Sequence, residues 1–276
     1  MNRNKRVSNG MCAAIAVALV CLVCPSAQAG EGSSEEPTYK VSENPVRYTS
    51  GPDTVRGVLY IPRAKVPRPG IIVIHEWWGL NTWVQESARR LAEQGYVALA
   101  IDLYRGEVAT DAEMAHELMR AVPEDRAARD LQMAVEYLRS RKEVMRDRVG
   151  SIGWCMGGGY SLQTAMVVPD LTACVMCYGR LVTEDASIQN MSAAVLGIFG
   201  DQDRGIPTDD VAAFEERSKK LGKSVATIVY EGAGHAFMNP NNERGYNEAA
   251  ADSAWIAIMD FLAQNLAPPA EVEDLK

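Results

Sequence analysis

The sequence predicts a single α/β domain in which helices cover both faces of a mostly parallel sheet. Short, wholly apolar runs alternate along the chain with segments that carry apolar residues at helical spacing. Strands that are apolar on both faces are typical of parallel sheets buried between helix layers. No internal repeat or interdomain linker interrupts the alternation, and the 247 residues that follow a predicted signal peptide suffice for one large core.

The predicted sheet begins with an N-terminal hairpin. Two strand-like segments flank Ser50-Gly51-Pro52-Asp53, whose residue types favour a turn. The strands that follow are short apolar runs separated by helical segments, as expected for parallel pairing. In chain order, the predicted strands are residues 41–48, 55–61, 70–74, 96–101, 149–152, 172–177, 193–199 and 224–230.

The predicted helices are recognised by apolar residues that recur every three or four positions. Residues 83–94 form the first, which Gly95 ends, and residues 111–119, 123–141 and 160–168 form the next three. The closing helix is indicated by an apolar face at helical spacing. That face consists of Trp255, Ile258, Met259, Leu262 and Leu266.

The N-terminus has the features of an export signal. Arg3, Lys5 and Arg6 precede an apolar run at residues 11–24, and Ala27-Gln28-Ala29 fits a cleavage site. The run of 14 residues is shorter than the roughly 20 that a membrane span needs, so we expect no stable membrane anchor. The predicted organisation is a signal peptide at 1–29, a flexible lead-in at 30–38, the α/β domain at 39–266 and a tail at 267–276.

Composition limits the partners of the exported protein, which we expect in the periplasm or secreted. Loss of the three basic signal residues takes the net charge from −8 to −11. No lysine- or arginine-rich block occurs, which disfavours nucleic acid and anionic membranes as partners. The expected partner is a small-molecule ester or lactone. We expect a monomer, with a dimer as the alternative.

Three of the six cysteines would leave with the signal, and Cys155, Cys174 and Cys177 would remain. Cys174 and Cys177 lie in a predicted buried strand. Residues three apart on a strand face opposite sides about 10 Å apart, which is too far for a disulfide. No second CxxC completes a zinc site. We therefore expect these two cysteines in the core.

Cys155 lies in the segment Gly153-Trp-Cys-Met-Gly-Gly158, between a predicted strand and a predicted helix. Its small residues permit the tight strand-to-helix turn called a nucleophile elbow, which projects one side chain into a cleft. The positive end of the following helix favours the reactive thiolate. The alternative is a glycine-rich turn that contains an inert cysteine.

Cys155 has candidate partners after other strands. Function gathers at the carboxyl ends of parallel strands, and the order Cys155, Asp203, His235 is the nucleophile–acid–histidine order of α/β-hydrolases. His235 stands in a glycine-flanked loop after the last predicted strand. Asp203 has the position usual for the acid, whereas Asp201 could pair with Arg204 or cap the turn.

The other histidines have simpler interpretations. His116 lies in a predicted polar helix and is expected in solvent, and His75 ends a strand as a possible hydrogen-bonded core residue. His75-Glu76 resembles the start of the zinc motif HExxH, but the fifth residue is Gly79, so we predict no metal site and no cofactor.

The cysteine elbow, His-Glu-Trp-Trp-Gly-Leu, Asp-Leu-Tyr-Arg-Gly and Gly-His-Ala-Phe together resemble the dienelactone hydrolase family over essentially the whole domain. The resemblance implies an α/β-hydrolase fold and a Cys155–His235–Asp203 triad that hydrolyses an ester or lactone through a thioester. It also implies an oxyanion hole made by the backbone N–H groups of Trp77 and Met156, and a glutamate, Glu76, that reaches the nucleophile.

The chemistry of Glu76 is consistent with that role. A carboxylate among Trp77 and Trp78 would be partly desolvated, which raises its affinity for a proton. It could then exchange a proton with the thiol when substrate arrives. The alternative is a structural salt bridge.

Substrate specificity is less clear from the resemblance. Characterised members hold the carboxylate of dienelactone with two arginines. One would fall near Arg105, at a spacing that differs by about one residue; the other would closely follow His235, where this chain has Met238 and Asn239. We assign Arg105 to a possible anion subsite. Tyr104, Trp78 and Phe237 are also assigned to the substrate-binding surface.

Two other functions stay open. The same triad could serve an acyltransferase or a peptidase-like hydrolase. The protein could also have the hydrolase fold without catalytic activity and serve as a binding or stress-response protein. This alternative gains weight because an exported thiolate is vulnerable to oxidation. A nucleotide-dependent enzyme is disfavoured, since neither G-x-G-x-x-G after the first strand nor a Walker sequence occurs.

Overall fold

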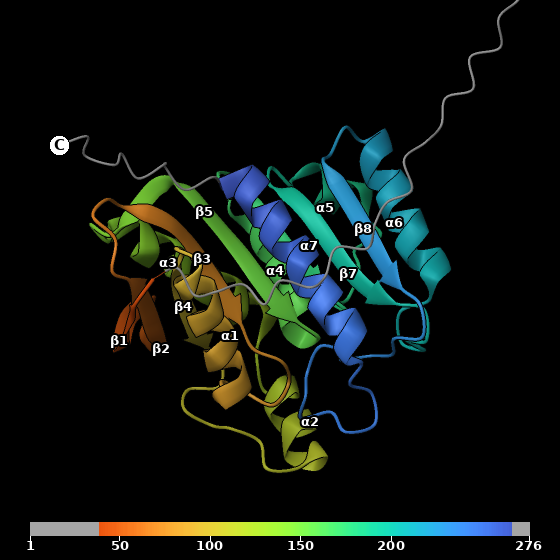
Figure 1. The fold of residues 1–276 in the computed structure, drawn as a ribbon, viewed down its shortest axis with the longest axis horizontal. Coiled ribbons are helices and arrows are strands. Elements are labelled where there is room, and N and C mark those ends of the chain that lie inside the picture. Colours follow the sequence, from red (N-terminus) through yellow and green to blue (C-terminus); the bar gives the residue numbers. More distant parts are fainter. Residues whose placement is uncertain (1–38, 267–276) are drawn as a thin grey trace, which may run out of the picture. The chain divides into compact units, whose positions relative to one another are not determined.

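The computed structural model describes residues 39–266 and contains one eight-stranded sheet in the order β1-β2-β4-β3-β5-β6-β7-β8 (Figure 1). The β1/β2 and β2/β4 pairs are antiparallel and all other pairs are parallel, which confirms the predicted hairpin and the mostly parallel sheet. The strands are β1 (Val41–Ser50), β2 (Asp53–Pro62), β3 (Arg68–Ile74), β4 (Val97–Asp102), β5 (Val144–Trp154), β6 (Ala173–Cys177), β7 (Ala194–Gly200) and β8 (Val225–Tyr230).

Helices lie on both faces of this sheet. α1 and α7 pack on one face, and α3, α4 and α6 pack on the other (Figure 1). The helices are α1 (Thr82–Glu93), α2 (Ala112–Arg120), α3 (Glu124–Ser140), α4 (Met156–Val167), α5 (Asp185–Gln189), α6 (Thr208–Lys220) and α7 (Glu248–Leu266). α5 and α6 were not predicted. α6 carries few apolar residues and buries only Val211, Phe214 and Ser218, so its helical period is weak.

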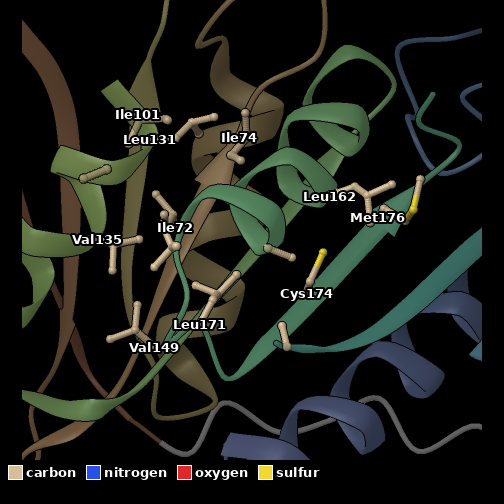
Figure 2. Packing of buried hydrophobic residues seen from close by; sticks show 14 of the residues in the cluster. Ile72, Ile74, Ile101, Leu131, Val135, Val149, Leu162, Leu171, Cys174 and Met176 are labelled. Carbon is tan, nitrogen blue, oxygen red and sulfur yellow. The ribbon is translucent and has the colours of Figure 1, made fainter. Parts of the chain in front are cut away.

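The core consists of two apolar layers, one on each face of the sheet. In the layer shown in Figure 2, Leu131 and Val135 of α3 pack with Ile72, Ile74 and other strand side chains, and Leu162 of α4 lies next to Met176. β3, β4 and β6 are buried along their full length, as their continuous apolar sequences predict. Both layers therefore fix the same set of central strands.

The predicted signal peptide, lead-in and tail lie outside the described residues. Within residues 39–266, the structure has no helix with both the length and the apolar character needed to cross a bilayer.

The sheet brings the candidate site residues to one edge. Glu76 follows β3, Cys155 follows β5, Asp203 follows β7 and His235 follows β8. β3, β5, β7 and β8 run parallel, so their carboxyl ends meet at the same edge. The fold thus explains how residues up to 159 positions apart can form one site.

The junction between β5 and α4 depends on close backbone contact. A Cβ atom on Gly153 would lie 2.1 Å from the Gly157 carbonyl oxygen, and a Cβ on Gly157 would lie 2.3 Å from the Ile74 carbonyl oxygen. Both distances are far below van der Waals contact. Glycine at these positions lets the strand, the turn and the helix approach one another.

We predict that Gly153→Ala lowers the free energy of unfolding by about 3 kcal/mol or more, because the clash is with backbone that cannot rotate away. Gly159→Ala, in the helix that follows the same turn, is the matched control, since its Cβ would meet its nearest neighbour at an ordinary 3.4 Å. Alanine there should stabilise the helix by about 0.5–1 kcal/mol. Urea unfolding of both variants checks this, and equal stabilities would contradict it.

Candidate active site

Cys155 occupies a strained turn at the start of α4. Its backbone has φ 54° and ψ −117°, a conformation that L-residues rarely adopt and that costs about 1–3 kcal/mol. Its N–H donates to the Cys177 carbonyl oxygen at 3.0 Å, and its own carbonyl accepts from Gly158 N at 3.0 Å. These bonds hold the turn in place, and the thiol is partly exposed in a cavity.

The three predicted triad residues meet. His235 Nε2 lies 3.1 Å from Cys155 Sγ, and His235 Nδ1 lies 2.7 Å from Asp203 Oδ2. Asp203 is buried and its Oδ1 accepts from Gly205 N at 2.9 Å, which fixes the carboxylate. Asp201 instead accepts from Gly232 N at 2.7 Å and so holds the turn after β8. The structure therefore separates the two candidate acids.

Local electrostatics favour a proton on His235. Desolvation by burial lowers the pKa of the imidazole, but the hydrogen bonds and negative charges of Asp203 and Cys155 outweigh burial and raise the pKa to about 10. The Asp203 pKa is lowered, because hydrogen bonds from His235 and backbone groups outweigh the raising effect of burial. The Asp203 carboxylate and a protonated His235 therefore stabilise each other.

Glu76 is buried beneath the same cavity. Its Oε2 accepts a 2.6 Å hydrogen bond from Asn239 Nδ2. Burial raises the pKa of Glu76 to about 7, against the lowering effects of the Asn239 amide, the His235 charge and the Tyr178 hydroxyl. The carboxyl group of Glu76 is thus fully buried, whereas the sequence predicted only partial desolvation. The alternative of a salt bridge is not realised, since the partner is a neutral amide.

Asn239 and Tyr178 are site residues that the sequence did not identify. Asn239 is buried, and its Oδ1 also accepts from Asn241 N at 2.9 Å. Tyr178 has φ 38°, rare for an aromatic residue, and its ring centroid lies 5.4 Å from that of His235. The only signal for Asn239 was a polar residue after apolar Phe237 and Met238; nothing in the sequence indicated Tyr178.

The two backbone groups predicted for the oxyanion hole lie at this cavity, which Trp77 and Met156 both line. In the described part of the chain, no protein acceptor is bonded to either N–H. The Met156 N–H is one of the free donors of the first turn of α4. The Tyr104 hydroxyl donates to the Trp77 carbonyl oxygen at 3.0 Å and contacts Met156 Sδ at 3.3 Å. Tyr104 therefore contacts both segments that carry these N–H groups, the one after β3 and the start of α4.

Three predicted substrate-binding residues have other roles. Arg105 donates from Nη2 to Asp130 Oδ2 at 2.6 Å and does not line the cavity, because the buried Asp130 carboxylate requires a counter-charge. Tyr104 is buried and braces the backbone. Phe237 is fully buried against Tyr178 and the ring of Tyr230. Arg105, Tyr104 and Phe237 therefore do not line the cavity at Cys155 in this structure.

The interpretations of the remaining histidines and cysteines are confirmed. His75 is buried, with Nδ1 donating to the Glu76 carbonyl oxygen at 2.6 Å and Nε2 accepting from Leu103 N at 3.2 Å. His116 is exposed, although its ring meets that of Trp77 edge-on at 4.8 Å. Cys174 and Cys177 are buried free thiols in β6.

The cavity at Cys155 has a volume of about 1220 Å³. Trp78, which was assigned to the substrate-binding surface, is partly exposed and lines this cavity. Residues of α4 and residues 180–184 form one part of its lining, and residues from the loop after β8, between 235 and 244, form another. Across residues 39–266, no group of three histidine, cysteine or acidic side chains is arranged to hold a metal ion.

Comparison with known proteins agrees with this geometry. Residues 55–266 match the model of the dienelactone hydrolase family. Protein usf of Aquifex pyrophilus is 33% identical over 219 residues, which cover 77% of this chain and 94% of the relative. A Bradyrhizobium protein named as a probable 2-oxo-3-(5-oxofuran-2-ylidene)propanoate lactonase is 34% identical over 211 residues, which cover 72% of this chain and 84% of the relative.

Solved structures show the same architecture. The crystal structure of a dienelactone hydrolase-like promiscuous phosphotriesterase from metagenomic libraries superposes with a TM-score of 0.76 and 26% identity. The match covers 82% of this chain and 98% of that one. The chain therefore belongs to the dienelactone hydrolase family, hydrolytic enzymes built on the α/β-hydrolase fold.

Proposed function

We propose that this enzyme cleaves an ester or lactone through a thioester on Cys155. The observation that carries the proposal is the row of three side chains in which His235 bridges Cys155 Sγ at 3.1 Å and Asp203 Oδ2 at 2.7 Å. A thiol, a base within hydrogen-bond reach and a carboxylate that orients the base make an activated nucleophile.

The reaction proceeds in two half-reactions. The Cys155 sulfur forms a bond to the acyl carbon, and the carbonyl oxygen takes up negative charge next to the N–H groups of Trp77 and Met156. The acyl carbon–oxygen bond then breaks, and the leaving oxygen receives the proton of His235. In the second half-reaction water gives a proton to His235 and adds to the thioester, which releases the acid and restores the thiolate.

Glu76 protects this charge arrangement in the proposed mechanism. It lines the cavity with Cys155, and a second negative charge there would oppose the thiolate. With a pKa of about 7, Glu76 holds its proton below about pH 7. Asn239 orients the carboxyl group without adding the positive charge that an arginine would bring.

A neutral substrate fits the cavity better than dienelactone. Arg105 is paired with Asp130, and Asn239 stands where a second arginine was considered. The arginines that do line the cavity, Arg180 and Arg244, are exposed, so water and salt screen their charges. We therefore propose esters without a carboxylate as the preferred substrates.

We predict that Cys155→Ala lowers the turnover of an activated acetyl ester by at least about 10³-fold, because the nucleophile is lost. Mass spectrometry of the quenched wild type should find the acyl group on Cys155. Cys174→Ala, a buried thiol outside the cavity, is the matched control and should keep its turnover. Acylation at another residue, or near wild-type turnover by Cys155→Ala, would refute the thioester. Added alcohol or amine acceptors distinguish hydrolysis from acyl transfer.

The raised pKa of Glu76 predicts a pH-dependent stability. In the folded protein the group keeps its proton up to about pH 7, whereas the unfolded chain releases it near pH 4.5. The unfolded state then binds fewer protons, so stability falls as pH rises between these values. Relative to Glu76→Gln, the wild type should lose about 3 kcal/mol over this window. Urea unfolding at pH 4.5, 6 and 8 measures the difference, and a difference that stays constant would contradict the prediction.

We also propose that the protein is exported with cleavage after Ala29, on the basis of the basic start, the apolar run and the Ala-Gln-Ala site. Cell fractionation and N-terminal sequencing of the expressed full chain should find a periplasmic or secreted protein that begins at Gly30. Ala29→Leu removes the small residue that cleavage requires and should leave the precursor uncut. A cytoplasmic wild-type protein with its N-terminus intact would refute export.

A further inference from the structure

The cavity is larger than a small lactone requires, and its two sides differ in polarity. Its volume of about 1220 Å³ exceeds the roughly 300–1,000 Å³ of a pocket that encloses a drug-sized ligand. One side is built by α4 and the segment after β6, and a second side by the segment after His235, while residues between 76 and 81, residues 108–110 and Met119 complete the lining. Cys155 lies at the start of α4. The difference between the sides carries information about the substrate.

The α4 side is an apolar wall. Met156, Tyr160 and Met166 lie on one face of α4 and line the cavity together with Leu181 and Val182. All five are partly exposed hydrophobic residues that pack on the core beneath them. Partly covered apolar side chains that continue from a catalytic centre gain stability when an apolar ligand covers them. This acyl wall is defined here as Met156, Tyr160, Met166, Leu181 and Val182.

The acyl wall extends away from the nucleophile. Cys155 and Met166 are 11 positions apart along a helix, which corresponds to about 16 Å. An extended hydrocarbon chain of that length contains about 12 carbon–carbon bonds, because each bond of about 1.5 Å advances a zigzag chain by only about 1.3 Å. Gln163 lies between Tyr160 and Met166 on the same face.

Charged residues next to the acyl wall leave its apolar surface accessible. Glu124, Arg180 and Glu184 also line the cavity there, and all three are solvent-exposed. Long charged side chains can keep their heads in water while their stems cover apolar surface. The partly buried surface available to a substrate chain on this side is therefore predominantly hydrophobic.

The side built by the segment after His235 is polar. Beyond Ala236, the residues that line it are Asn239, Asn241, Asn242, Glu243 and Arg244. The Nδ2 of Asn242 donates to the carbonyl oxygens of His235 and Ala236, which ties this segment to the catalytic histidine. No apolar side chain from residues 239–244 lines this side of the cavity.

His235 decides which part of an ester faces which side. In the proposed mechanism its proton goes to the leaving oxygen, so the alcohol must lie next to His235 and the segment that follows it. The acyl group then extends along α4. We propose that the enzyme prefers esters of an extended, unbranched apolar acid with a small polar alcohol, and that Met166 marks the far end of the acyl site. This inference rests on the thioester mechanism proposed above.

The test is a series of p-nitrophenyl esters with acyl chains of two to sixteen carbons, assayed on the full mature enzyme. Each methylene that leaves water for the acyl wall should raise kcat/KM by about two- to fourfold. The increase should stop near ten to twelve carbons, where the wall ends. A profile that is flat, or that falls steadily from acetate, would overturn the inference.

Two variants shorten the proposed site by different amounts. Met166→Trp should lower the ratio of kcat/KM for decanoate to that for butyrate by about tenfold, because it removes the burial of the last methylenes. Gln163→Trp lies one turn closer to Cys155 and should already impair the octanoate. Ile256→Trp, on an exposed position of α7 outside the cavity, should leave the profile unchanged. Ratios within one enzyme preparation do not depend on how much of the variant folds.

A second measurement concerns the alcohol. With butyrate as the common acid, 2-hydroxyethyl butyrate should react with a higher kcat/KM than propyl butyrate, and Asn241→Leu should reduce that preference. A preference for the propyl ester would overturn the assignment of the polar side. If acyl-Cys155 forms but neither preference is found, the inference fails and the thioester mechanism stands. If no ester acylates Cys155, both fail.

Discussion

The turn between β5 and α4 is the constraint on which the rest of the site depends. Gly153 and Gly157 approach neighbouring backbone so closely that a Cβ atom at either position would clash with it. Cys155, between them, has a strained backbone conformation with positive φ. The strain persists because two core layers hold the strand and the helix in place. The turn fixes the thiol and leaves the Met156 N–H free beside it. The geometry of the candidate site is thus a consequence of backbone packing.

Burial and the available hydrogen-bond donors together determine which carboxyl groups of the site are ionised. Asp203 and Glu76 are both buried carboxyl groups, yet their pKa values move in opposite directions. Asp203 has His235 and backbone donors and stays ionised, whereas Glu76 has chiefly a neutral amide from Asn239 and holds its proton to about pH 7. Burial of Asp130 likewise determines the role of Arg105, since an unpaired carboxylate in the core would be costly. Arg105, near the end of β4, is therefore paired with Asp130 and does not line the cavity.

Much of the fold and the reacting groups could be predicted because they depend on local patterns. Continuous apolar runs identified the central strands, and helical spacing identified α1, α3 and α7. The scarcity of histidine limited the base to His235. α6 was missed because its apolar face is sparse. The roles of Tyr104, Phe237 and Asn239 could not be predicted, since each depends on a contact with a residue far away in the sequence. Asn239 meets Glu76 across 163 positions.

By itself the sequence determined the fold class, the order of the candidate nucleophile, acid and base along the chain, and the family resemblance, because these depend on residue types and their spacing. Only the tertiary structure decided between Asp201 and Asp203, paired Arg105 with Asp130 and buried Phe237 in the core. It also brought apolar residues of α4 and polar residues of the segment after His235 to the cavity at Cys155. The physical reason is that partners and exposure follow from packing between distant segments, which local patterns do not encode.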